Sequence, residues 1–105
     1  EVNGTYIQEG VHDETPMYHM KGMWEDREVI FTIYLLNGGT WYISIVPEGE
    51  TTGEHNDIDF YKCDHTSDNP WMIPFKGWQT IWNGQASPPT CSMCFVTGCF
   101  DTENL

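Results

Sequence analysis

Apolar side chains dominate two segments near the middle of the chain, residues 29–36 and 40–46, with few polar positions between them. Short apolar runs of this kind are typical of β-strands, and the intervening Asn37-Gly38-Gly39 is typical of a hairpin turn. A loop of all three residues pairs apolar side chains with apolar side chains across the hairpin. A two-residue turn would shift one strand by one position and exchange its faces, so we predict the three-residue loop.

This loop length fixes the register of the predicted hairpin. The predicted pairs are Leu36 with Thr40, Leu35 with Trp41, Tyr34 with Tyr42, Ile33 with Ile43, Thr32 with Ser44, Phe31 with Ile45, and Ile30 with Val46. The register places Trp41 beside Leu35 in the core. Both faces are rather apolar, so we expect a second sheet, the chain ends or a partner to cover the outer one.

Shorter strands are predicted over residues 5–8, 17–20, 57–62 and 79–82, with polar loops at 47–56 and 64–70. In the third of these strands Ile58 and Phe60 alternate with Asp57, Asp59 and Tyr61, a pattern typical of a half-buried strand. The predicted fold is all-β, a small antiparallel sandwich or rolled sheet of residues 1–90. Residues 91–105, after the break at Pro88-Pro89, are predicted to form an irregular, cysteine-rich tail packed on the module or on a neighbour.

The chain has 105 residues, which fits one domain, and a formal net charge of −12. So acidic a surface disfavours nucleic acid and anionic membranes, and no run of apolar residues is long enough for membrane insertion. No nucleophile elbow and no hydrolytic zinc motif occurs, and the four histidines stand in polar segments or beside acids. We therefore expect a protein that is not an enzyme.

Four cysteines, Cys63, Cys91, Cys94 and Cys99, indicate two disulfides and an oxidising compartment. We expect Cys63 to pair with Cys91 or Cys94, and the remaining thiol of that pair to close a small loop to Cys99. A Cys₄ zinc site is the alternative, because Cys91 and Cys94 have the spacing of half such a site. The other two cysteines do not repeat this spacing.

The same reasoning places the protein outside the cell, either secreted or on the cell surface. Asn3-Gly4-Thr5 is a glycosylation sequon, so Asn3 is the predicted attachment site. Glu1 is interpreted as a mature or excised terminus, since no signal-peptide pattern opens the chain.

No cofactor is expected, and calcium is the alternative. Asp57, Asp59, Asp64 and Asp68 are carboxylates in or beside loops, which are common calcium ligands. Met17, His19, Met20 and Met23 are soft ligands that copper accepts, although methionine is equally suited to packing.

Five tryptophans are many for this length. Trp78, Trp82 and Tyr42 are candidate platforms for sugar rings or for protein contacts, because large rigid aromatics serve both. Phe95 and Phe100, together with Val96, are candidate anchors on a neighbouring module.

Short motifs spread over residues 2–91 combine aromatic residues with Gly, Pro or Cys. They are Asn3-Gly4-Thr5-Tyr6, Pro16-Met17-Tyr18, Trp41-Tyr42-Ile43, Phe60-Tyr61-Lys62-Cys63, Pro70, Gly77-Trp78 and Pro88-Pro89-Thr90-Cys91. In these motifs the chain resembles a loosely defined class of small secreted β modules that occur in tandem in extracellular proteins of marine invertebrates and protists. The resemblance implies a display, adhesion or structural role and no catalytic residues.

Together these observations predict an extracellular structural or adhesive module that acts by protein–protein contact. Its expected partners are further copies of itself, as in a repeat array or filament, or an extracellular matrix protein. The alternative is a carbohydrate-binding module with exposed tryptophans, assisted by calcium.

Overall fold

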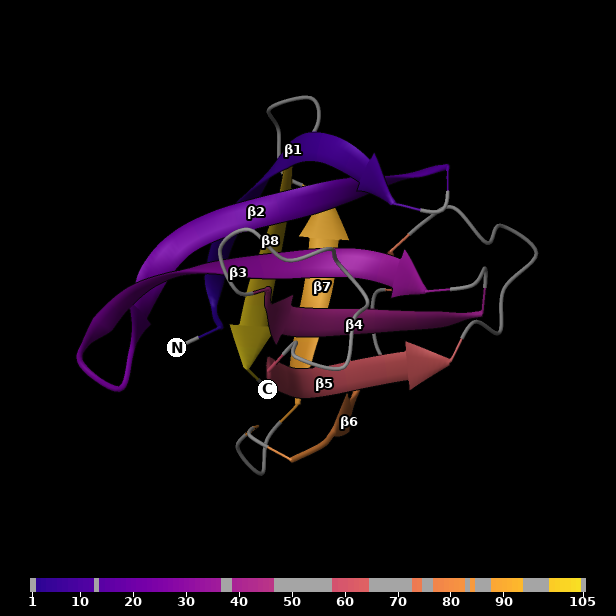
Figure 1. Cartoon of the computed structure of the whole chain (residues 1–105). Coiled ribbons are helices and arrows are strands. Elements are labelled where there is room, and N and C mark those ends of the chain that lie inside the picture. The colour runs from indigo at the N-terminus through magenta and orange to yellow at the C-terminus, as the bar shows by residue number, and fades with distance from the viewer. Residues whose placement is uncertain are drawn as a thin grey trace.

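The structure is a computed structural model, and it describes residues 2–12, 14–36, 39–46, 58–64, 73–74, 77–82, 84, 88–93 and 99–104. Within these residues eight strands form one antiparallel sheet in the order β6-β5-β4-β3-β2-β1-β8-β7 (Figure 1). The strands are β1 (Gly4–His12), β2 (Thr15–Trp24), β3 (Arg27–Leu36), β4 (Thr40–Ile45), β5 (Ile58–Asp64), β6 (Gln79–Thr80), β7 (Pro89–Met93) and β8 (Cys99–Asn104). The predicted all-β, antiparallel fold is confirmed.

The β3–β4 hairpin has the predicted register. Phe31 lies opposite Ile45, Ile33 opposite Ile43, and Leu35 opposite Trp41. The N–H of Gly39 donates to the carbonyl oxygen of Leu36 at 3.1 Å and closes the loop. The pairing follows from burial, because a slip of one residue would turn the apolar side chains away from the core.

A second hairpin, β2–β3, is longer than the sequence pattern indicates. Its strands pair without interruption as far as Trp24 opposite Arg27. The two turn residues, Glu25 and Asp26, have φ angles of 50° and 62°. Two successive positive φ angles match the twist of a hairpin, which is why a two-residue turn of this kind joins strands so closely.

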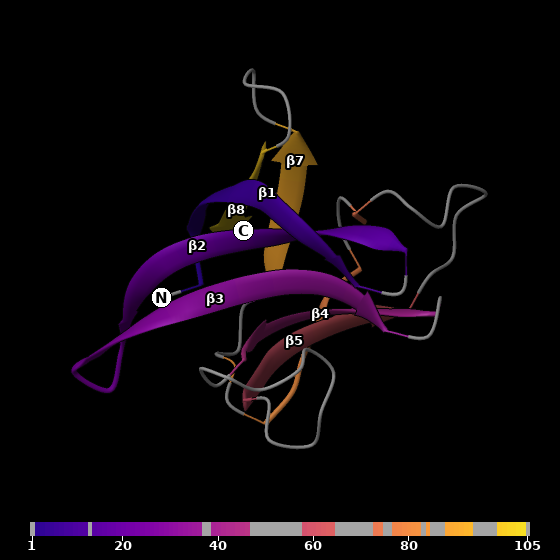
Figure 2. The ribbon, with the colours of Figure 1, turned by 45° about the horizontal axis from the view of Figure 1, so that its top comes forward.

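The sheet rolls at β1, which pairs with a different strand along each half of its length. Gly4–Ile7 pairs with β8, whereas Ile7–His12 pairs with β2. The β1–β2 register shifts by one residue between Gln8 and Val11, and Gly10 in this bulge has a φ of 80°. Bulges bend strands, so β7 and β8 pass behind β2–β4 at a steep angle (Figures 1 and 2).

The prediction of an irregular tail from residue 91 is wrong for the described part of that segment. Residues 89–93 and 99–104 are strands β7 and β8, and β8 lies between β1 and β7 in the sheet. The predicted boundary after residue 90 falls inside β7. The physical reason is that the peptide groups of β1 need partners, and backbone pairing supplies them without an apolar sequence pattern.

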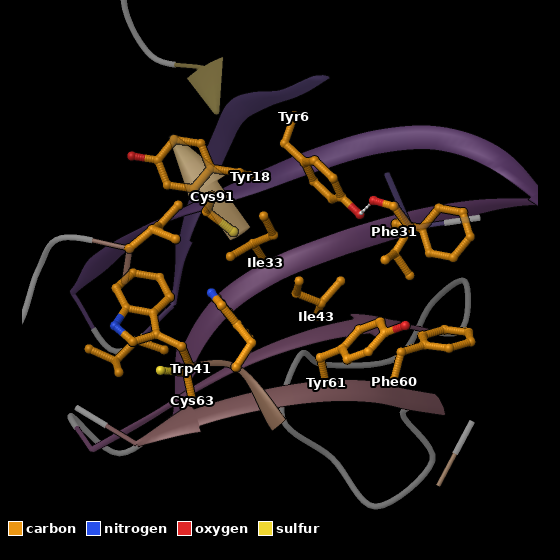
Figure 3. Close-up of a cluster of buried hydrophobic side chains, with 14 of the residues drawn as sticks. Tyr6, Tyr18, Phe31, Ile33, Trp41, Ile43, Phe60, Tyr61, Cys63 and Cys91 are labelled. Atoms are coloured by element: carbon orange, nitrogen blue, oxygen red, sulfur yellow. Dashed lines mark hydrogen bonds between the residues drawn. The ribbon is translucent and has the colours of Figure 1, made fainter. Parts of the chain in front are cut away.

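The core lies between the two parts of the rolled sheet. Figure 3 shows Tyr6, Ile33, Trp41, Ile43 and Phe60 directed into it, all of them fully buried. Trp41 is therefore in the core, as predicted. Its indole N–H is buried and, among the described residues, has no hydrogen-bond partner.

A bulge in β5 changes the predicted faces of that strand. Ile43 lies opposite Tyr61 but Ser44 lies opposite Asp59, so Phe60 is an extra residue. Phe60 and Tyr61 are consequently both buried. The prediction that Tyr61 shares the polar face with Asp59 is wrong, because strict alternation fails at a bulge.

No helix among the described residues is long and apolar enough to cross a membrane.

Candidate functional site

Apolar side chains stand on the outer face of β1–β3, the face turned away from the core. Ile7 on β1 is 53% exposed and Ile30 on β3 is 45% exposed. Between them lie His19 and Lys21 of β2, because Ile7 pairs with His19 and Lys21 pairs with Ile30. We call the four residues Ile7, His19, Lys21 and Ile30 the outer row.

The outer row borders a shallow hollow of about 380 Å³. On its rim His19 Nδ1 lies 2.8 Å from Oε1 of Glu9, a carboxylate that is well exposed. An ion pair this exposed contributes little to stability, since water screens it. The hollow therefore combines one polar pair with exposed isoleucine side chains.

A larger hollow of about 590 Å³ begins where β4 ends and β5 starts. Its apolar lining includes Val29 and Ile30 of β3, Ile45 of β4, and Ile58 of β5. The two hollows share Lys21 and Ile30, so they are neighbours on the molecule. We call the larger one the β3 hollow.

Two of the four basic residues in the chain, Lys21 and Arg27, line the β3 hollow. The guanidinium carbon of Arg27 lies 6.0 Å from the ring centroid of Trp24, within the range of a cation–π contact. In the described part of the chain neither basic side chain forms an ion pair. In a chain of net charge −12, these two cations make the β3 hollow a local exception to the acidic surface.

A second cluster lies on the outer face of β3–β5 around Tyr42. Its ring stacks on Tyr34 with centroids 5.7 Å apart and planes 23° apart, and His12 meets Tyr34 edge-on at 5.3 Å. Asp59 accepts a hydrogen bond from Ser44, and Asp64 accepts one from Thr40 at 3.1 Å.

The electrostatics of Tyr42 reflect this position. Burial raises the pKa of the Tyr42 hydroxyl, and the charges of Asp59 and Asp64 raise it further. The hydroxyl therefore stays protonated and can donate a hydrogen bond at neutral pH. A partly exposed aromatic ring with a donor and two nearby carboxylates is able to hold a polar ligand by stacking and hydrogen bonding.

The structure separates the two candidate tryptophans. Trp78 is 5% exposed, belongs to the core, and donates from Nε1 to the carbonyl oxygen of Pro74 at 3.0 Å. Its ring is therefore not available for stacking on a sugar. Trp82, two residues beyond β6, is 85% exposed.

Other candidate residues lie outside the residues that the structure describes, or are described only through their backbone. Asp57, Asp68, Cys94 and Phe95 are outside the described residues. Cys99 and Phe100 are described only through their backbone, in β8, where they lie opposite Ile7 and Tyr6. Asn3 precedes β1 and is exposed, as a glycosylation acceptor must be.

Cys63 of β5 and Cys91 of β7 are buried thiols in the same core cluster and are not linked to each other. Burial raises the pKa of both thiols, that of Cys91 to about 12. A smaller electrostatic effect adds to each shift: the charge of Asp64 acts on Cys63, and Cys63 acts on Cys91. A thiol that is protonated and buried is a poor nucleophile and a poor metal ligand. Disulfide stapling is not shown by the structure.

Within the described residues, no three His, Cys, Asp or Glu side chains converge as a metal site would require. Asp59 and Asp64, two of the four candidate calcium ligands, instead bind neighbouring hydroxyls.

The residues of the β3 hollow were not singled out by the sequence. Lys21 lies within β2 and Arg27 begins β3, and the signal that could have indicated them is their rarity in so acidic a chain. The exposed isoleucines give a weaker signal, because alternation alone does not distinguish the outer face from the core.

No protein-family model matches the chain, and comparisons with curated proteins and with solved structures likewise give no match.

Proposed function

We propose that the protein is a non-enzymatic, extracellular β module that acts through protein–protein contact and self-associates. The observation that carries this proposal is the outer row, where Ile7 and Ile30 are both about half exposed beside a hollow. Exposed apolar side chains grouped around a depression and rimmed by polar groups are typical of contact surfaces. Burying them against another copy removes apolar area from water and favours association.

The extracellular location is supported by the acidic composition, the cysteine count and the exposure of Asn3 in its sequon. Disulfide bonding belongs to the same proposal. Cys63 and Cys91 come from strands in different parts of the rolled sheet, so a bond from Cys63 to Cys91 or Cys94 would fasten those parts together. A peptide mass map of secreted protein, made without reduction, should find such a bond. Alkylation of all four cysteines without reduction would contradict it.

Self-association is tested by sedimentation of the wild type and of Ile7→Gln over a range of concentrations. We expect the wild type to form dimers or larger species. Ile7→Gln should raise the dissociation constant of self-association by about tenfold or more, because the variant loses the apolar contact area of Ile7. Val11→Gln is the matched control. Val11 is 66% exposed on the same strand but borders neither hollow. A wild type that stays monomeric at high concentration contradicts the proposal.

A second candidate function, carbohydrate binding, is favoured by the Tyr42 cluster. Tyr42, stacked on buried Tyr34, offers its ring to a sugar, while Asp59 and Asp64 accept hydrogen bonds from the sugar hydroxyls. A glycan array with wild type, Tyr42→Ala and Trp82→Ala tests it, with one arm in EDTA for calcium assistance. Loss of a specific signal in Tyr42→Ala supports this function, whereas no signal from the wild type contradicts it.

A further inference from the structure

Among the described residues, one edge of β3 has no partner strand over its first four residues. The β3–β4 pairing ends at Phe31 opposite Ile45, whereas the β2–β3 pairing continues to Arg27. Among the described residues, therefore, β3 has a partner strand on only one side from Arg27 to Ile30. An open edge of this kind is a template for a further strand.

The register shows which peptide groups face this edge. Leu36 accepts the hydrogen bond that closes the β3–β4 loop, so its peptide groups are turned toward β4. Peptide groups of alternate residues point to the same side of an antiparallel strand, so those of Ile30 and Glu28 are turned the same way. The peptide groups of Glu28 therefore lie beyond the end of β4, and those of Ile30 lie beside the last β3–β4 pair, Phe31 with Ile45.

The β3 hollow lies beside this edge. Val29 and Ile30 line it from β3, and Ile45 and Ile58 line it from the two strands that end or begin there. A strand added at this edge would therefore cover the apolar side chains of the β3 hollow.

The charges are divided between the two faces. Side chains alternate along a strand, so Arg27 and Val29 share one face, while Ile30 and its cross-strand partner Lys21 share the other. Each face of an added strand would thus meet one apolar and one cationic side chain. Neither cation has a carboxylate partner in the described structure, and Glu28 is the acidic residue among the described lining of the hollow.

We propose that the open edge of β3 and the β3 hollow bind a short extended peptide segment in which two acidic residues are followed by two apolar residues, so that each face of the segment carries one carboxylate and one apolar side chain. The backbone of the segment pairs with Glu28 and Ile30, its apolar side chains enter the hollow, and its carboxylates pair with Lys21 and Arg27. The four-residue edge accommodates about four residues of peptide, or roughly 13 Å of extended strand. Main-chain pairing with alternate side-chain contacts is the usual mode of strand addition. This inference rests on the proposed contact function and names the chemistry of one partner.

The test uses three capped hexapeptides and the ¹⁵N-labelled full chain, followed by NMR. The first peptide has two Asp or Glu residues, then two Ile or Val residues, then two Asp or Glu residues. The second has Lys at every acidic position, and the third is the first with a central proline. We expect the acidic peptide to shift the amide signals of Glu28 and Ile30 and to slow their hydrogen exchange. The lysine peptide should bind at least about tenfold more weakly, because like charges meet at the site. The proline peptide should also lose affinity, since it lacks one backbone N–H.

Charge-reversal variants assign the contact. Arg27→Glu and Lys21→Glu should each weaken binding of the acidic peptide by about tenfold. Lys62→Glu is the matched control, because Lys62 is a basic residue of β5 that does not line the hollow, and it should leave the affinity within about twofold. Thermal melts exclude unfolding as the cause.

Several outcomes overturn the inference: no binding at millimolar acidic peptide, equal binding of the lysine peptide, or shifts that avoid Glu28 and Ile30. Dodecanoate, an anionic amphiphile, serves as a competitor. If dodecanoate displaces the peptide and does not protect the amides of Glu28 and Ile30, the hollow would instead be assigned to an anionic amphiphile. The result is separable from self-association when peptide affinity is measured at concentrations where sedimentation shows monomer. Ile7 does not line the β3 hollow, so Ile7→Gln should then leave the peptide affinity unchanged. Failure of peptide binding in a wild type that still self-associates removes this inference alone.

Discussion

Thr102 and Gly4 are 98 positions apart in the chain, yet the hydroxyl of Thr102 accepts a hydrogen bond from the N–H of Gly4 at 2.9 Å. The same hydroxyl donates to the carbonyl oxygen of Val2 at 2.8 Å, an oxygen that also accepts from Tyr6 at 2.7 Å. Thr102 is buried, so its hydroxyl is a structural contact between β8 and the start of the chain.

Replacing Thr102 with Val should lower the free energy of unfolding by about 1–3 kcal/mol, because the N–H of Gly4 is left without its acceptor in a partly buried site. Urea titrations followed by fluorescence measure the change. Thr102→Ser keeps the hydroxyl and is the matched control, which should lose clearly less. Equal losses in the two variants would contradict the role of the hydroxyl.

Gly22 is expected to tolerate no side chain, because a Cβ there would lie 2.8 Å from the ring of buried Phe31. Gly22→Val should destabilise by about 1–3 kcal/mol through overpacking. The matched control is Gly39→Ala, since a Cβ at Gly39 meets nothing within 4 Å. Thermal melts of both variants measure their loss of stability relative to the wild type. A Gly39→Ala loss as large as that of Gly22→Val would count against the packing argument.

The β2–β3 turn can be improved. Glu25 and Asp26 both adopt positive φ angles, a conformation that costs residues other than Gly and Asn free energy. Glu25→Asn combined with Asp26→Gly should raise the free energy of unfolding by about 1 kcal/mol, because Asn-Gly prefers this turn. Glu28→Gly, a glycine within β3, should instead destabilise the protein. A double variant no more stable than wild type would contradict the prediction.

Stability should fall at alkaline pH through Cys91. Its pKa is raised from 9.0 to about 12 by burial, so the folded state favours the protonated thiol. This contribution is fully present below pH 9 and is lost as the pH rises toward 12. The slope from this group is up to about 1.4 kcal/mol per pH unit.

The measurement is a series of urea titrations between pH 8 and pH 10 with a phosphine reductant present. The upper limit avoids the titration of Tyr6, whose pKa is also raised by burial. Cys91→Ala lacks the titrating thiol and should show a shallower slope. Parallel slopes for the two proteins would rule out Cys91 as the source.

Side-chain alternation predicted the strands whose faces differ in burial. The β3–β4 register follows from the three-residue loop, because only that loop pairs Ile33 with Ile43 and Leu35 with Trp41 on the buried face. Alternation did not indicate β7 and β8, because β8 is held by backbone pairing with β1, and β7 by backbone pairing with β8. It also missed the bulge at Phe60, because an extra residue has no signature in the sequence pattern.

The candidate site was predictable to a lesser extent. Tyr42, Asp59 and Asp64 were each identified in the sequence. Their proximity could not be, because it depends on the pairing of β4 with β5. Trp78 and Trp82 are indistinguishable by residue type, and only packing separates a core residue from an exposed one. The hollow beside β3 required knowing where β4 ends.

The place of β8 between β1 and β7 has a consequence for folding. Of the eight described strands, β1 is made before the others and β8 after them, so during synthesis the Gly4–Ile7 stretch has no partner until about 90 further residues have been added. Closing so long a loop is slow, and an edge left open in the meantime attracts other strands. Chaperone dependence and losses to aggregation should therefore concentrate in the interval before β8 emerges from the ribosome.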